Sequence, residues 1–64
     1  MRVNGENVQI NEGMRLSEYL EQQGYAVKRV AVERNGEIVP KGMYEECVLN
    51  DSDTLEIVHF VGGG

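Results

Sequence analysis

The sequence is poor in the residues that small domains use as covalent or metal crosslinks. Its 64 residues include one cysteine, Cys47, and one histidine, His59, and no tryptophan. An intrachain disulfide needs a second cysteine, and a structural zinc site needs about four Cys or His ligands. The fold must therefore depend on a single apolar core, for which 41% of the residues are hydrophobic.

Long apolar runs and basic charge are also scarce. No run approaches the roughly 20 residues that span a bilayer, and the first five residues lack the apolar region of a secretory signal. With one unpaired cysteine, these features predict a cytoplasmic protein that binds no membrane. The 11 acidic residues outnumber the 6 basic ones. This balance disfavours nucleic-acid binding, which needs a basic footprint, and fits either a basic partner surface or simple solubility.

Two Asn-Gly pairs predict two β-hairpins, because this dipeptide accepts the positive φ angles of a tight turn. Asn4-Gly5 forms the first turn and Asn35-Gly36 the second, and Pro40 ends the second hairpin. Apolar residues at strand spacing flank both turns. They are Met1, Val3, Val8 and Ile10 in the first hairpin, and Val30, Val32, Ile38 and Val39 in the second.

A change from strand to helix period predicts one amphipathic helix between the hairpins, over residues 14–23. Leu16, Tyr19 and Leu20 form its apolar stripe. Gly24 is well placed as the left-handed residue that ends a helix.

The segment after the second hairpin is ambiguous over residues 41–46, where Met43 and Tyr44 offer apolar anchors and a single helical turn is one option. Residues 50–53 form a polar turn cluster. The last strand is predicted over residues 54–61. Its apolar residues divide between two faces, with Leu55 and Ile57 toward the core and Val58 and Phe60 away from it.

The order strand, strand, helix, strand, strand, short turn, strand predicts an α+β fold. We expect a mixed sheet of about five strands with one main helix packed on one face. The helix stripe should then pack against the inward-facing strand residues, which are Val3, Val8, Val32, Leu55 and Ile57.

Three glycines, Gly62, Gly63 and Gly64, follow the last strand. We interpret residues 1–61 as the domain and residues 62–64 as a flexible tail, because glycine keeps the most backbone freedom. Without Cβ atoms the tail can enter a narrow channel of another protein. There its carboxylate can attack the α-phosphate of a nucleotide and form an acyl-adenylate. The alternative is an incidental terminus, and the position directly after the last strand favours a functional tail.

With this tail the chain resembles the ThiS-type sulfur carriers of thiamine biosynthesis, a ubiquitin-like β-grasp family. The segments that carry the resemblance are MRVNGE (1–6), LSEYL (16–20), VAVERNGEIVP (30–40), NDSDTLEI (50–57) and VGGG (61–64). They extend over the whole chain. The hairpin ending in Ile-Val-Pro and the Asp-x-Asp turn are fairly specific, whereas a Gly-Gly end is shared by all ubiquitin-like carriers. Gly62 stands where members of the family often have alanine.

The resemblance implies a carrier cycle in which the chain is a substrate and not an enzyme. A ThiF-like ATP-dependent activating enzyme would adenylate the Gly64 carboxylate. A sulfur-transfer protein or cysteine desulfurase would supply the persulfide that converts it to a thiocarboxylate, and thiazole synthase would take the sulfur. Val58, Phe60 and Val61 would bind these partners, and the chain would hold no cofactor or metal of its own.

Two other functions stay open at this point. The small subunit of molybdopterin synthase has the same fold and tail, although the short hairpins here favour the thiamine carrier. A ubiquitin-like docking domain that is never activated would tolerate a blocked C-terminus. Cys47 is better explained as a small core residue, because its neighbours Glu45 and Glu46 disfavour a reactive thiolate. His59 lacks an evident nucleophile partner.

Overall fold

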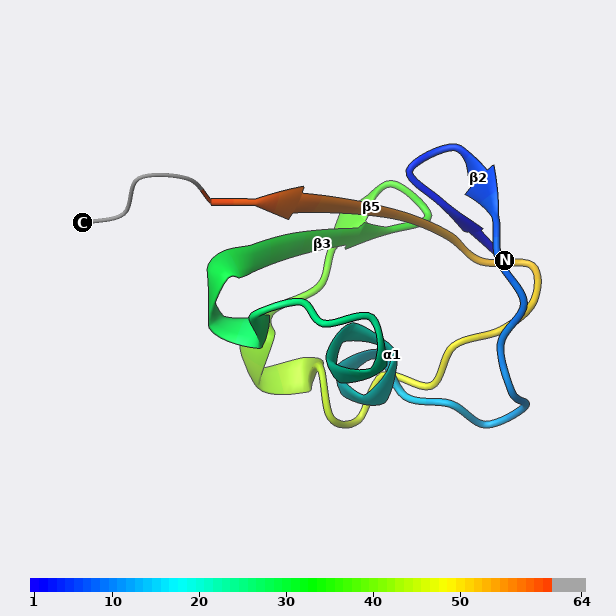
Figure 1. Ribbon diagram of the computed structural model, residues 1–64, viewed down its shortest axis with the longest axis horizontal. Helices are drawn as coiled ribbons and strands as arrows, with labels where there is room; N and C mark the ends of the chain where they lie inside the picture. The colour runs from blue at the N-terminus through cyan, green and yellow to red at the C-terminus, as the bar shows by residue number, and fades with distance from the viewer. Residues whose placement is uncertain (61–64) are drawn as a thin grey trace.

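The computed structural model describes residues 1–60, which form a five-stranded sheet with one α-helix on one face (Figure 1). The strands are β1 (Arg2–Val3), β2 (Glu6–Asn7), β3 (Val30–Arg34), β4 (Glu37–Ile38) and β5 (Thr54–His59). The helices are α1 (Leu16–Gln22) and two short 3₁₀ turns, η1 (Val27–Arg29) and η2 (Lys41–Met43). The sheet order β2-β1-β5-β3-β4 places β5 in the centre, parallel to β1 and antiparallel to β3. The predicted α+β class and mixed sheet are confirmed.

Both Asn-Gly pairs form the predicted turns. Asn4 and Asn35 have φ angles of +51° and +52°, and the glycine that follows each has +86°. Two successive residues with positive φ match the hairpin turn whose twist suits the flanking strands.

The return strand of the first hairpin is shorter than predicted. Val8 and Ile10 lie beyond β2 and are only half-buried, although both pack against the core. The Val8 N–H still donates to the Met1 carbonyl at 2.8 Å. The chain then leaves the sheet, because it must cross to the other layer to begin α1.

The helix also begins later than predicted, because the residues before it are extended. The Met14 carbonyl accepts a hydrogen bond from the Leu49 N–H at 2.8 Å, and the Leu16 N–H donates to the Cys47 carbonyl at 2.8 Å. The loop thus satisfies an N–H that the first turn of a helix leaves unpaired. Gly24 follows the helix with φ +82°, as predicted. No helix within residues 1–60 is long and apolar enough to cross a membrane.

The core lies between α1 and the sheet (Figure 1). Its buried hydrophobic residues are Val3, Leu16, Tyr19, Leu20, Val30, Val32, Tyr44, Leu49, Leu55 and Ile57. The predicted helix stripe and the inward face of β5 are therefore confirmed. The ambiguous segment contains the single helical turn η2, directly followed by Tyr44, whose hydroxyl donates to the Val30 carbonyl at 3.3 Å. Met43, the other expected anchor, is exposed.

We predict that Leu20→Ala lowers the free energy of unfolding by about 2–5 kcal/mol, because it leaves a cavity in a fully buried position. This is a large part of the roughly 3–10 kcal/mol expected for a domain of this size. Urea unfolding followed by circular dichroism measures the loss. Ile38→Ala is the matched control: Ile38 is 74% exposed, and its truncation should cost less than about 0.5 kcal/mol. Equal losses in both variants would contradict the core described above.

Candidate functional site

The strand that leads into the predicted tail is hydrogen-bonded along its whole length to β3. The ladder begins where the Asn35 N–H donates to the Thr54 carbonyl at 2.8 Å. It ends where the Phe60 N–H donates to the Arg29 carbonyl at 2.7 Å. These hydrogen bonds hold the chain up to Phe60, which is the last residue that the structure describes.

The opposite edge of β5 is held by Asn4, at the point where β1 ends. The Asn4 N–H donates to the Leu55 carbonyl at 2.9 Å. Its side chain then replaces a backbone partner: Oδ1 accepts from the Ile57 N–H at 2.8 Å, and Nδ2 donates to the Ile57 carbonyl at 3.3 Å. The sequence indicated Asn4 only as a turn residue, and this second role was not predicted. One side chain thus extends a two-residue strand along β5.

The start of β5 is fixed by a buried carboxylate, Asp53, which is 4% exposed. It accepts hydrogen bonds from Arg34 Nε at 2.9 Å, Asn35 Nδ2 at 3.0 Å and the Asn50 N–H at 2.9 Å. Burial by itself raises the pKa of the Asp53 carboxyl. Its three hydrogen-bond donors and the charge of Arg34 have the larger combined effect, so the pKa lies below its ordinary value of 3.8. The carboxylate therefore joins the end of β3 and the β3–β4 turn to the turn that precedes β5.

The outward face of β5 carries two exposed apolar side chains near the tail. Val58 is 56% exposed and Phe60 is 52% exposed, as the strand pattern predicted. The Lys41 ammonium lies 5.5 Å from the centre of the Phe60 ring, within cation–π range. The third predicted contact residue, Val61, and the tail, residues 62–64, lie outside the described residues.

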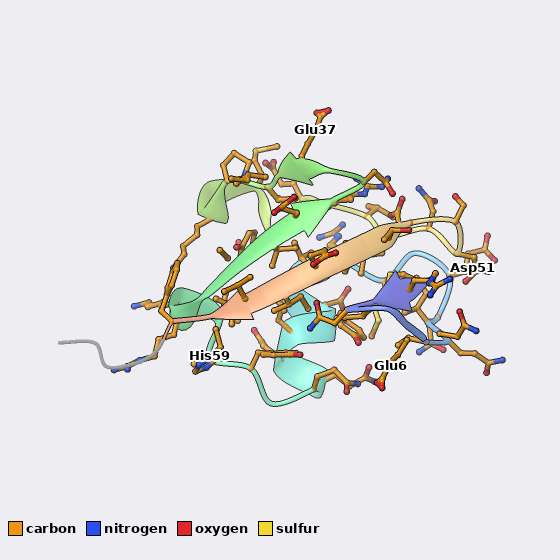
Figure 2. All side chains as sticks on the ribbon, turned by 90° about the horizontal axis from the view of Figure 1, so that it is seen from above. Glu6, Glu37, Asp51 and His59 are labelled. Carbon is orange, nitrogen blue, oxygen red and sulfur yellow. The ribbon has the colours of Figure 1, made fainter. Side chains whose placement is uncertain are left out.

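Among residues 1–60, the side chains with reactive groups lie apart from one another. Cys47 is half-buried, and its Sγ accepts a hydrogen bond from Arg34 Nη1 at 3.5 Å. His59 is exposed at the end of β5 (Figure 2). Within residues 1–60, no three His, Cys, Asp or Glu side chains are grouped to hold a metal ion. The exposed apolar pair Val58 and Phe60 is the feature of this surface that lies nearest the predicted tail.

The sheet order and the single helix define a ubiquitin-like β-grasp domain. A solved structure, the thiamine biosynthesis protein (ThiS) from Geobacter metallireducens, has the same fold with a TM-score of 0.81. It is 29% identical in sequence, and the match covers 98% of this chain and 96% of that one. The model of the ThiS family matches residues 1–64. The chain belongs to the ThiS family.

Curated relatives agree with this assignment. The sulfur carrier protein ThiS of Bacillus subtilis is 62% identical over 37 residues, which are 58% of this chain and 56% of that protein. A thiazole synthase from Paramagnetospirillum magneticum is 47% identical over 62 residues, which are 97% of this chain and 19% of that protein. A thiazole synthase from Magnetococcus marinus is 42% identical over 64 residues. The chain spans only about a fifth of either thiazole synthase.

We predict an acid-dependent contribution of Asp53 to stability. Because its pKa is lower in the folded state, the ionised carboxylate stabilises the fold above about pH 4. That contribution is lost as the pH falls through the folded-state pKa. Asp53→Asn should cost about 1–3 kcal/mol at pH 7, and the gap to the wild type should narrow below about pH 4.

Thermal unfolding at several pH values measures this gap. Asp51→Asn is the matched control, because Asp51 is exposed in the same turn. A gap for Asp53→Asn that stays constant from pH 7 to acid would contradict the ionised hydrogen-bonded carboxylate.

Proposed function

We propose that the chain is a sulfur carrier for the thiazole ring of thiamine, and that its working group is the Gly64 carboxylate. The observation that carries the proposal is the match of the whole chain, tail included, to the ThiS family. A member of similar sequence in Bacillus subtilis is named a sulfur carrier protein. The glycines begin three positions after His59, the last residue of the central strand β5, and this position supports the same function.

The proposed chemistry takes place on the tail and inside partner enzymes. A carboxylate oxygen of Gly64 attacks the α-phosphate of ATP, and pyrophosphate leaves. The terminal sulfur of a persulfide then attacks the acyl carbon and displaces AMP. A thiol of the sulfur donor reduces the resulting acyl disulfide by forming a disulfide with the donor sulfur, which leaves a thiocarboxylate on Gly64. The chain itself acts as substrate and sulfur donor, not as an enzyme.

The domain contributes a rigid base for this tail. The ladder to β3 and the Asn4 side chain fix β5 up to Phe60. The four residues after Phe60 can extend at most about 14 Å. A partner that grips the domain therefore determines how far Gly64 enters its channel.

The partners that fit this cycle are a ThiF-like activating enzyme, a sulfur-transfer protein or cysteine desulfurase, and thiazole synthase. In two relatives the matching stretch is part of a protein named thiazole synthase. The matching stretch and the rest of thiazole synthase form one chain in those relatives, which supports thiazole synthase as a partner. The proposed location is the cytoplasm, with no binding to nucleic acid or membrane.

We infer that the partners bind the outward face of β5 next to the tail. Val58 and Phe60 are large apolar groups exposed there, and Val61 continues the same stretch of sequence. Exposed apolar side chains beside a reactive terminus are typical of an interaction surface.

The first prediction of this proposal concerns the intact mass. After incubation with ATP, a persulfide source and the activating enzyme, the chain should gain the mass difference between sulfur and oxygen. Deletion of Gly64 should abolish the gain, whereas the fold should persist, because the tail lies beyond the core. Intact-mass spectrometry measures both, and it also checks that the chain ends at Gly64. No gain, with an enzyme shown to activate a known carrier, would refute the proposed function.

The second prediction concerns the docking face. Val58→Ser with Phe60→Ser should lower kcat/KM for activation by at least about tenfold, because apolar anchors dominate such interfaces. Pyrophosphate exchange measures the rate. The matched control is Ile38→Ser with Val48→Ser, which changes two exposed aliphatic residues away from the tail. If the control pair slowed activation as much as the β5 pair, the docking face would be wrong.

A further inference from the structure

Three segments that are distant in sequence meet at the base of the tail. The Phe60 N–H donates to the Arg29 carbonyl at 2.7 Å. The Lys41 ammonium donates to the Lys28 carbonyl and lies 5.5 Å from the centre of the Phe60 ring. Lys28, Arg29 and Lys41 are all exposed. We call these three residues the basic collar.

The basic collar stands out against the charge of the rest of the chain. It contains three of the 6 Lys and Arg residues, in a chain with 11 acidic residues and a net charge of −5. The segments around it, residues 22–32, 38–44 and 57–60, contain no acidic residue at all. Every carboxylate side chain of the chain therefore lies on other segments.

Figure 2 labels three of the acidic side chains and, with His59, the end of β5 that leads to the tail. His59 marks the end of β5 that leads to the tail, and Asp51 lies at the opposite end. Glu6 and Glu37 lie along the two sides, on the edge strands β2 and β4. Among residues 1–60, the ion pair that forms joins Arg34 to Asp53, and none involves the basic collar. No carboxylate side chain among residues 1–60 forms an ion pair with the basic collar.

We propose that the basic collar recognises carboxylate side chains at the mouth of the channel through which the adenylating enzyme admits the tail. This inference rests on the proposed function and adds the chemistry of the partner surface. An acidic rim attracts the basic collar and repels the acidic remainder of the chain. It therefore orients the chain with its tail toward the channel. Such complementarity raises the rate of productive encounter more than the final affinity.

The reach of the tail favours carboxylates over the phosphates of bound ATP as the anions that meet the collar. The carboxyl end lies up to about 14 Å beyond Phe60 when the last four residues are extended. When that end is at the nucleotide, the basic collar is at the channel entrance. Exposed charge pairs at an entrance are screened by salt. The collar should therefore affect kcat/KM and its salt dependence, and should leave kcat nearly unchanged.

The test compares two charge reversals of equal size. Lys28→Glu with Arg29→Glu alters the basic collar, and Arg2→Glu with Arg15→Glu makes the same change in net charge at exposed positions elsewhere. Pyrophosphate exchange by the adenylating enzyme is measured at low and high salt, and thermal unfolding checks that both variants fold. We expect the collar variant to lose about tenfold in kcat/KM at low salt, the control less than about twofold, and the difference to vanish near 1 M salt.

Each other result overturns the inference. Equal losses in both variants would mean that only net charge matters. A loss that persists at high salt would mean a contact other than charge pairing. If the wild-type chain supports no exchange with an enzyme active on a known carrier, the proposed function fails and the collar fails with it.

Binding measured without chemistry separates the two anion sources. The chain lacking Gly64, with and without the collar reversal, is mixed with the enzyme in the absence of nucleotide, and the association rate constant is measured by stopped flow. We expect the collar reversal to lower this rate constant by about tenfold there as well. A difference that appears only after ATP is added would assign the collar to nucleotide phosphates and would overturn the proposal.

Discussion

Backbone hydrogen bonds on both edges of β5 join the two halves of this domain. The hairpins β1–β2 and β3–β4 form one sheet only because β5 lies between them, with β1 on one edge and β3 on the other. Hairpins this short are marginal alone and need a third strand and a packed face. The strand that completes the sheet is thus the last one in sequence, and its parallel pairing with β1 is a contact between distant parts of the chain. When β5 pairs with its two neighbours, the sheet is completed and the base of the tail is fixed at the same time.

Because some strands are short, side chains supply hydrogen bonds that a longer strand would make with its backbone. β1 has two residues, and beyond it the Asn4 amide takes over both backbone groups of Ile57. At the start of β5, the Asp53 carboxylate accepts hydrogen bonds from Arg34, Asn35 and the Asn50 N–H, and so connects two turns. Both devices are buried or half-buried polar contacts with every partner in place, which is the condition under which such groups stabilise a fold. Asp53 thus fixes the start of β5 and Asn4 fixes its middle, while the Phe60–Arg29 hydrogen bond holds the end next to the tail.

Local patterns in the sequence predicted the features that local physics determines. The Asn-Gly turns, the α1 stripe and the two faces of β5 follow from dihedral preference and apolar period. Tyr44 was an expected anchor and is buried, whereas the core position of Leu49 and the extended residues before α1 depend on contacts between loops. The Asn4–Ile57 contact spans 53 positions, so no window of sequence contains it. The basic collar has a partial signal, the absence of acidic residues from three segments, but only the fold brings these together. The role of Gly64 rests on family resemblance and stays a prediction.

The central position of β5 also determines how the domain responds to tension. A partner that pulls on the tail pulls along the axis of β5. Hydrogen bonds in a sheet run across the strands, so the ladders to β3 and β1 are loaded together in shear instead of opening one bond at a time. An edge strand such as β4 is held by one ladder only, so fewer hydrogen bonds would resist the same force. A tail attached to the centre of the sheet can therefore be drawn into a tight channel and withdrawn again while the domain stays folded.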